Sequence, residues 1–416
     1  MGMGLLRAYT SILFLVAFLT TNGQSGKTRP YLILVSFDGF RHDYIETFDL
    51  PNFKEFMVNG SSAEALVPSF PSKTFPNHYS IVTGLYPGSH GLVDNSFYDP
   101  ALDSEYGMSI RSQVINPAFY GGTPIWRLAR EAGIKSASYF WVGSEVDDEN
   151  LRPDYYYEYD ASVSSRSRID QVVNWLSSPE ESRPHFITLY FSSPDWEAHR
   201  HGPSAVETRD AALQADSLLG YLMQQLKTVS LPVNVLLTSD HGLTELVIDS
   251  KTYIYLDQLL PVSGASYRVV NGGTQAHIYT TGPEQTDSLY NVLNGSDARI
   301  TVYRKQDFPR EWHYTHPRVG DLLILANHPH YLLNSFGGYL RDGKPGTIRG
   351  VHGYDPYRVR DMHGIFLAQG PNIKKGVRLK PVRNVDLYPL MAKILGLQPP
   401  PIDGDGKQTF QIYKRK

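Results

Sequence analysis

The chain has 416 residues, of which 41% are hydrophobic and 19% charged, and its formal net charge is −3. This length and apolar content are enough for one large α/β domain or two smaller ones, and they argue against a disordered chain. The net charge is close to neutral and the sequence has no block of Lys or Arg residues, so it indicates no basic surface for binding a nucleic-acid backbone. We therefore expect no nucleic-acid polymer among the partners.

The first 26 residues have the composition of a targeting segment. Arg7 precedes an apolar run over residues 11–20, which is too short for an ordinary membrane span and is followed by small and polar residues. This pattern predicts a signal peptide over residues 1–26 that is removed on export, so the mature chain has no stable membrane span. An uncleaved membrane anchor is the alternative.

The chain contains no cysteine, so an exported form has no disulfide to brace it. Export without disulfides fits a bacterial periplasm better than a eukaryotic secretory route. We therefore expect an exported protein, either periplasmic or secreted.

Compact apolar runs alternate with amphipathic stretches along most of the chain. The runs predict buried strands over residues 31–37, 186–191 and 233–237. Apolar residues at helical spacing predict helices over residues 123–132, 165–176, 205–226 and 384–395. Strands that alternate with helices indicate an α/β fold in which a mostly parallel sheet is covered on both faces.

Residues 251–347 break this rhythm, because short strand-like runs over 276–279, 299–303 and 322–325 are separated by turn residues. We interpret this segment as a small inserted α+β lobe. The main domain then comprises residues 27–250 and 348–416.

Carboxylates follow each of the three predicted strands, as Asp38, Asp195 and Asp240. A carboxylate just past a buried strand is unfavourable unless another charge compensates it. In open parallel sheets ligands gather beyond the carboxyl ends of the strands, so these three side chains are expected to converge there. Three aspartates together with three histidines form a ligand inventory suited to paired zinc ions, and the histidines concerned are His199, His241 and His352. The sequence thus predicts a metalloenzyme.

A hydroxyl at Thr74 precedes a predicted helix whose first turn contains Pro76. Backbone N–H groups and the helix dipole at such a place favour an alkoxide and an incoming phosphate. An isolated threonine before proline is more often only a helix cap, so the surrounding sequence has to decide.

The segment around Thr74 reads Lys-Thr-Phe-Pro-Asn-His-Tyr-Ser over residues 73–80, and it closely resembles the nucleophile region of a known family. That family is the nucleotide pyrophosphatase/phosphodiesterase family of the alkaline-phosphatase superfamily, here as a bacterial-type member. Further matches follow in the family's order at residues 38–41, 195–203, 239–242 and 352–353.

This resemblance implies an alkaline-phosphatase-like three-layer α/β/α sandwich and a hydrolase with two Zn²⁺ ions. The main domain would then be the catalytic phosphodiesterase domain. The expected substrates are small nucleotides, such as nucleoside triphosphates, dinucleotide polyphosphates and nucleotide sugars. The expected product is a nucleoside 5′-monophosphate, released through a covalent threonine-nucleotidyl intermediate.

The resemblance also implies which residues bind the metal ions. One zinc ion would be bound by Asp195, His199 and His352. The second would be bound by Asp38, Asp240, His241 and the Thr74 oxygen. Asp195 and His199 are four residues apart, which places both on one face of a helical turn.

Substrate contacts follow from the same resemblance. Asn95 matches a position that hydrogen-bonds a non-bridging phosphate oxygen. Phe75 resembles the family's stacking phenylalanine, Tyr159 aligns with its partner, and Tyr190 is a third candidate wall of the nucleoside slot. Base stacking on such rings contributes about 1–3 kcal/mol per base and tolerates different bases.

The chain departs from the family pattern beside the first zinc ligands. Ala198 stands where the family usually has glycine, and Trp196 and Glu197 are also unusual, which leaves the substrate preference open. Two alternatives therefore remain, a choline or lipid-headgroup phosphodiesterase on the same scaffold and a catalytically inactive binding module. Two further histidines, His201 and His363, match no ligand position, so a structural role is expected for both.

Overall fold

The computed structural model describes residues 29–260, 266–335, 341 and 343–415. The predicted signal peptide over residues 1–26 lies outside the described residues. Within them, no helix is both long and apolar enough to cross a membrane.

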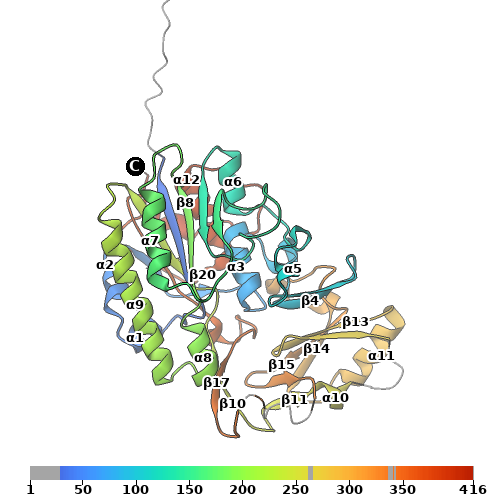
Figure 1. Ribbon diagram of the computed structural model, residues 1–416. Coiled ribbons are helices and arrows are strands. Elements are labelled where there is room, and N and C mark those ends of the chain that lie inside the picture. The colour runs from blue at the N-terminus through green and yellow to red at the C-terminus, as the bar shows by residue number, and fades with distance from the viewer. Residues whose placement is uncertain (1–28, 261–265, 336–340, 342, 416) are drawn as a thin grey trace, which may run out of the picture.

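An eight-stranded sheet forms the centre of the molecule (Figure 1). Its strands, in spatial order, are β19 (Arg378–Leu379), β2 (Ser61–Ala63), β18 (Phe366–Gln369), β9 (Val233–Thr238), β1 (Tyr31–Phe37), β8 (Phe186–Phe191), β6 (Ser136–Tyr139) and β7 (Tyr155–Tyr157). The five strands from β9 to β7 run parallel, whereas β18 is antiparallel to both β9 and β2. The mostly parallel sheet that the sequence predicts is confirmed.

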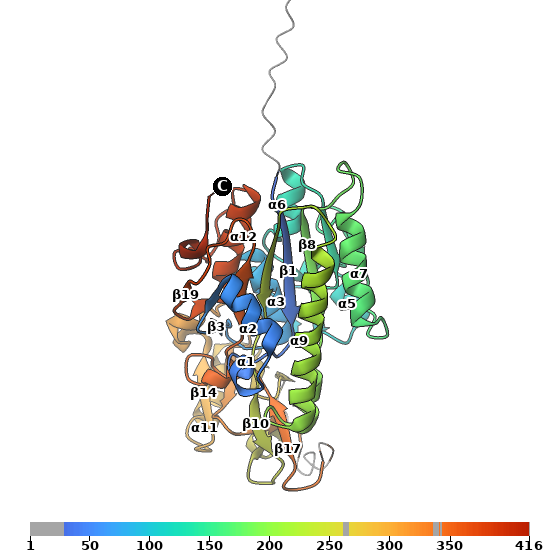
Figure 2. The same cartoon turned by 90° about the vertical axis from the view of Figure 1, so that its left-hand side faces the viewer.

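Helices cover both faces of this sheet because β1 is apolar on both sides. Ile33 and Val35 pack in one buried cluster with the helices of one face, and Leu32 and Leu34 pack in another cluster with those of the opposite face. The first face carries α2 (Pro51–Asn59), α7 (Ser165–Leu176) and α9 (Val206–Leu226). The second carries α3 (Thr74–Thr83), α6 (Ile125–Glu131) and α12 (Leu387–Leu395). Figure 2 shows α2 and α9 in front of the sheet, with α3 behind them.

The parallel strands end at one edge of the sheet, and this edge carries the predicted carboxylates. Asp38 follows β1 directly, and Asp240 lies two residues beyond β9. The sequence predicts Asp195 at the end of a strand, but residues 192–194 separate it from β8. Asp195 instead begins the short helix α8 (Asp195–His201). A helical start holds Asp195 and His199 on the same side of α8.

The segment predicted as an inserted lobe contains an antiparallel sheet of four strands in the order β12 (Arg268–Asn271), β13 (Gln275–Tyr279), β15 (Leu322–Ala326) and β14 (Ile300–Arg304). Helix α11 (Pro283–Leu293) packs on it through Leu289 and Leu293. Trp312 of this segment stacks on Phe70, with ring centroids 3.9 Å apart, just ahead of α3. The boundaries at residues 251 and 347 stay a prediction.

Short elements complete the described chain. Paired strands are β3 (Leu66–Val67) with β20 (Val382–Arg383), β4 (Ser96–Asp99) with β5 (Ser104–Gly107), β10 (Thr244–Val247) with β17 (Ile348–Val351), and β11 (Tyr253–Tyr255) with β16 (Tyr331–Leu333). Short helices are α1 (Tyr44–Thr47), α4 (Pro87–His90), α5 (Arg111–Val114) and α10 (Leu256–Leu259).

The central position of β1 makes it sensitive to truncation. We expect Ile33→Ala to lower the free energy of unfolding by about 2–5 kcal/mol, because it removes fully buried methyl and methylene groups and leaves a cavity. Urea denaturation of the metal-loaded protein measures this loss. The control is Val58→Ala on α2, where the side chain is 75% exposed and we expect a change below about 0.5 kcal/mol. Equal losses for both variants would contradict the central role of β1.

Candidate metal centre

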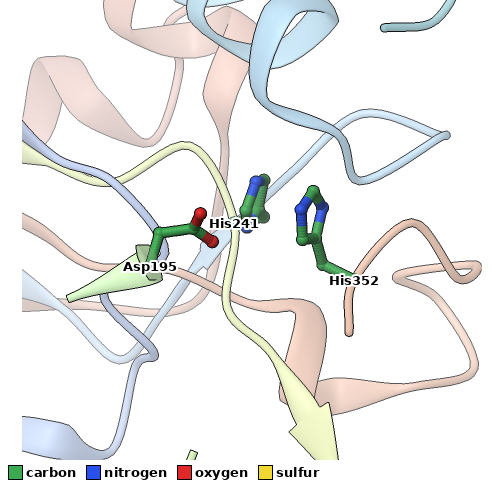
Figure 3. Close-up of side chains that lie close together, drawn as sticks. All are labelled: Asp195, His241 and His352. Carbon is green, nitrogen blue, oxygen red and sulfur yellow. The ribbon is translucent and has the colours of Figure 1, made fainter. Parts of the chain in front are cut away.

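Two groups of metal-ligating side chains lie at the edge of the central sheet. The first consists of Asp195, His241 and His352, whose ligand atoms all lie within 4.8 Å of one another. Figure 3 shows these three side chains gathered around a common space, although they come from distant segments of the chain. The rings of His241 and His352 stack with centroids 3.7 Å apart.

The second group consists of Asp38, His78 and Asp240, again with ligand atoms within 4.8 Å of one another. His241 lies close to this group as well, because its Nε2 is 3.1 Å from Oδ2 of Asp240 and 3.8 Å from Oδ1 of Asp38. The two groups therefore form one continuous site with His241 between them.

A glycine turn brings the carboxylates together. Gly39 has a φ of +64°, and a Cβ at this position would lie 2.7 Å from Cβ of Asp195. Its backbone N–H donates to Oδ1 of Asp240 at 3.1 Å. Because any side chain at residue 39 would collide with Asp195, the approach of Asp195 to Asp38 and Asp240 requires glycine here.

The histidines are oriented by backbone carbonyls. Nδ1 of His199 lies 2.8 Å from the Gly350 carbonyl oxygen, and Nδ1 of His352 lies 2.8 Å from that of Ser72. An imidazole that donates Nδ1–H to a carbonyl presents Nε2 as the lone-pair donor, which is the arrangement typical of metal-ligating histidines. Nε2 of His199 faces Oδ1 of Asp195 at 3.5 Å, so His199 borders the first group. That group contains His241 in place of His199, and the role of His199 as a ligand stays a prediction.

Three carboxylate oxygens in this site make no hydrogen bond that would compensate their negative charge. Asp38 Oδ1, Asp195 Oδ1 and Asp240 Oδ2 are buried and make no hydrogen bond, although imidazole nitrogens of His241 and His78 lie 3.1 and 3.3 Å from the Asp240 oxygen. Burial, together with the charges of Asp240 and Asp195, raises the pKa of Asp38 well above its ordinary value. Burial also lowers the pKa of His241 and His352, so both rings favour the neutral form that binds metals. These oxygen and nitrogen donors fit two divalent cations.

Thr74 is the first residue of α3 and faces the middle of this site. Its Oγ1 lies 3.1 Å from Nε2 of His241. Asn95 lies beside it, because its Oδ1 accepts a hydrogen bond from the Phe75 backbone N–H at 2.9 Å. A hydroxyl and a side-chain amide therefore meet at the N-terminus of α3, next to the candidate metal ligands.

The predicted nucleoside contacts occupy two positions. Phe75 is half-buried after Thr74, and its ring lies 6.3 Å from that of Tyr106. Tyr159 is 49% exposed, and its ring lies 6.2 Å from that of Tyr190. Tyr190 itself donates its hydroxyl to Oδ2 of Asp38 at 2.6 Å, a contact with a candidate metal ligand that the sequence did not indicate. The roles of these rings toward a base stay predictions.

His78 belongs to the site although the sequence analysis assigned it no role. Its Nδ1 lies 3.0 Å from the Thr74 carbonyl oxygen and 3.3 Å from Oδ2 of Asp240, and its Nε2 lies 2.8 Å from Oγ of Ser36. The available signal was its position four residues after Thr74, which places both on one face of α3. The other two histidines lie outside both groups, where His201 faces Glu207 at 3.8 Å and His363 bonds the Pro356 carbonyl oxygen.

Known proteins resemble this chain over most of its length. Residues 32–355 match the family described as type I phosphodiesterase / nucleotide pyrophosphatase. A protein of Xenopus laevis named bis(5′-adenosyl)-triphosphatase enpp4 is 34% identical over 404 residues, which cover 96% of this chain and 85% of that protein. The chain belongs to this family.

Longer relatives contain the same region as a part. A venom phosphodiesterase of Crotalus durissus collilineatus is 35% identical over 95% of this chain, and ectonucleotide pyrophosphatase/phosphodiesterase family member 1 of Mus musculus is 35% identical over 93%. The matches cover 48% and 43% of those proteins, so the chain spans about half their length or less.

A solved structure confirms the fold. Murine ectonucleotide pyrophosphatase/phosphodiesterase 5, an inactive Thr-to-Ala variant in complex with AMP, superposes with a TM-score of 0.84 at 31% identity. The match covers 92% of this chain and 100% of that one. The predicted family and α/β fold are therefore confirmed, and the chain is a member of a hydrolase family with candidate ligands for two metal ions.

The unpaired carboxylates make stability dependent on metal. We expect a chelator to lower the melting temperature and Zn²⁺ to restore it, since a cation at 100 times its dissociation constant stabilises the folded state by about 2.7 kcal/mol. Differential scanning fluorimetry measures this. In the metal-free protein, Asp38→Asn should raise the melting temperature, because it removes one of three mutually repelling carboxylates. In the presence of Zn²⁺ the same variant should be stabilised less than the unmodified protein. A chelator without effect on either protein would contradict a metal centre.

Proposed function

We propose that this protein hydrolyses phosphodiester and pyrophosphate bonds of nucleotides and releases a nucleoside 5′-monophosphate. The observation that carries the proposal is the position of Thr74, whose hydroxyl lies 3.1 Å from His241 at the start of α3 and at the centre of the metal-ligand groups. A hydroxyl in this place would be activated as a nucleophile by cations bound to these groups.

The reaction that this arrangement supports has two displacements. Thr74 releases its hydroxyl proton to solvent and its Oγ1 attacks phosphorus, the bond to the leaving oxygen breaks, and the leaving group departs with the electron pair and takes a proton from solvent. Water then attacks the phosphothreonine, the bond to Oγ1 breaks, and the threonine regains its proton. Two zinc ions, when bound, lower the pKa of the threonine hydroxyl and of the water.

Residues of the chain supply the remaining stabilisation. The Oδ1 atom of Asn95 is engaged by the Phe75 N–H, which leaves its Nδ2 as the donor for a non-bridging phosphate oxygen. The positive end of the α3 dipole favours the same negative charge. Phe75 and Tyr159 form the proposed slot for the nucleoside.

Nucleotides are the proposed substrate class because of the relatives' names. The Xenopus laevis protein is named for a bis-adenosyl triphosphate, and the murine structure holds AMP. A zinc pair is the proposed metal content, since a site of carboxylates and imidazoles suits zinc. Elemental analysis of the purified protein tests the metal.

Export is also part of the proposal. The apolar run over residues 11–20 and the absence of cysteine support a cleaved signal and a periplasmic or secreted protein of bacterial type. Mass spectrometry of the N-terminus of protein recovered from each cell fraction tests both points, and a full-length cytoplasmic chain would contradict them.

Removal of the nucleophile separates catalysis from binding. We expect Thr74→Ala to lower kcat by about 1000-fold or more, because no other hydroxyl takes its place, while metal content and melting temperature change little. Thr74→Ser retains a hydroxyl at the same atom position and should keep a measurable part of the rate. A Thr74→Ala variant with an unchanged rate would remove Thr74 from this role and leave the fold assignment intact.

Two chromogenic substrates distinguish the nucleotide hypothesis from the lipid-headgroup hypothesis. We expect p-nitrophenyl thymidine 5′-monophosphate to be cleaved with a higher kcat/KM than p-nitrophenyl phosphorylcholine, because Phe75 and Tyr159 offer aromatic faces to a base. Release of p-nitrophenol gives both rates. Faster cleavage of the choline ester would overturn the nucleotide assignment, and no cleavage of either would favour an inactive binding module.

A further inference from the structure

Asp94, which directly precedes Asn95, is a buried carboxylate that the proposed reaction does not use. It is 1% exposed, and its Oδ1 accepts the backbone N–H of Asn95 at 2.7 Å. Its Oδ2 accepts hydrogen bonds from strand β13, at 2.5 Å from Nε2 of Gln275 and 3.2 Å from Nε2 of His277. A buried carboxylate with three donors is fixed in one position.

The two donors on β13 are themselves held in orientation. Nδ1 of His277 accepts the Gly320 backbone N–H at 3.4 Å, so the ring proton resides on Nε2 and points to Asp94. Oγ1 of Thr274 donates to Oε1 of Gln275, which turns the amide nitrogen toward the same carboxylate. The His277 ring and the Gln275 amide are thus oriented by groups other than Asp94, so β13 presents two N–H donors to this carboxylate.

The network continues from Asp94 into the reaction centre. Asn95 accepts the Phe75 N–H through Oδ1, which leaves Nδ2 as the donor proposed for the phosphate. Phe75 follows Thr74 in the first turn of α3. The chain of contacts therefore leads from β13 through Asp94 and Asn95 to the turn that carries the nucleophile.

A second contact joins the β12–β13 hairpin to Lys73, the residue directly before Thr74. Lys73 is 7% exposed, and its Nζ donates to the carbonyl oxygen of Gly272, in the turn between β12 and β13, at 2.7 Å. Its side chain passes so close to Gly353 that a Cβ there would lie 2.4 Å from Cε of Lys73. Since Gly353 follows His352, the lysine also lies against a segment that supplies a metal ligand.

We propose that Asp94 is a positioning residue for the hydrolysis. It holds Asn95 and the first turn of α3 in register with the metal ligands, and it does so through donors supplied by β13. The proposal rests on the role assigned above to Asn95 in binding the phosphate.

The test is Asp94→Asn, which places an amide N–H against the N–H donors of Gln275 and His277. We expect kcat for p-nitrophenyl thymidine 5′-monophosphate to fall by up to about 100-fold, because misplacing a transition-state contact by an ångström has an effect of this size. KM and zinc content should change little. The matched control is Asp99→Asn, another buried carboxylate, which pairs with Arg318 at 2.6 Å and has no bond to Asn95. This control should leave kcat nearly unchanged even where it lowers the melting temperature, and an equal loss of kcat would overturn the proposal.

A double-mutant cycle decides whether Asp94 acts through Asn95. If it does, Asp94→Asn lowers kcat in the unmodified protein and has almost no further effect in an Asn95→Ala background. Additive losses would overturn the positioning role. An Asn95→Ala variant with unchanged kcat would instead refute the proposed phosphate contact, so the two failures are distinguishable.

A swap of the partners gives a rescue. In the combined variant Asp94→Asn with Gln275→Glu, the new amide donates to the new carboxylate, so kcat should recover most of its loss. If Asp94→Asn does not fold, Gln275→Leu removes one of the two donors and leaves the carboxylate in place, and we expect a smaller loss of kcat with unchanged KM. No loss of kcat in a folded Gln275→Leu protein, or no recovery in the swap, would overturn the proposal.

Discussion

Electrostatic repulsion among three carboxylates, two of them buried, is the constraint on which the rest of this structure depends. Asp38, Asp195 and Asp240 meet at one edge of the sheet, and each has one buried oxygen that makes no hydrogen bond. Such a cluster is unfavourable in a folded protein unless cations occupy it. The surrounding chain is built to maintain the cluster, since Gly39 allows the close approach and backbone carbonyls hold two of the histidines in the ligating orientation.

The central sheet supplies the rigidity that this cluster requires. Strand β1 is apolar on both sides and pairs in parallel with β8 and β9. The chain segments that follow these three strands therefore begin at the same edge of the sheet. A site on strand ends and helix starts is held more closely than a site on loops. The same packing that stabilises the fold therefore fixes the distances between metal ligands.

The proposed nucleophile is held from a different part of the molecule. Lys73 directly precedes Thr74 and Asp94 directly precedes Asn95, and both bond the turn and strand of the β12–β13 pair, about 200 residues further along the chain. Trp312 stacks on Phe70 ahead of the same helix. The four-stranded sheet and the segments joined to it thus contact the residues that directly precede Thr74 and Asn95, as well as Phe70 ahead of α3.

Local pattern in the sequence determined which segments form the main strands and helices, and it named the candidate site residues. Predominantly apolar runs mark parallel strands because burial on both faces favours apolar side chains along most of their length, and the segment over residues 73–80 carries the family resemblance. Only the tertiary structure decided which groups face one another. It placed His78 against Asp240, bonded Tyr190 to Asp38, and brought Gln275 and His277 to Asp94. Hydrogen bonds between residues up to 183 positions apart leave no periodic trace in the sequence, because they depend on how the packed elements orient single side chains.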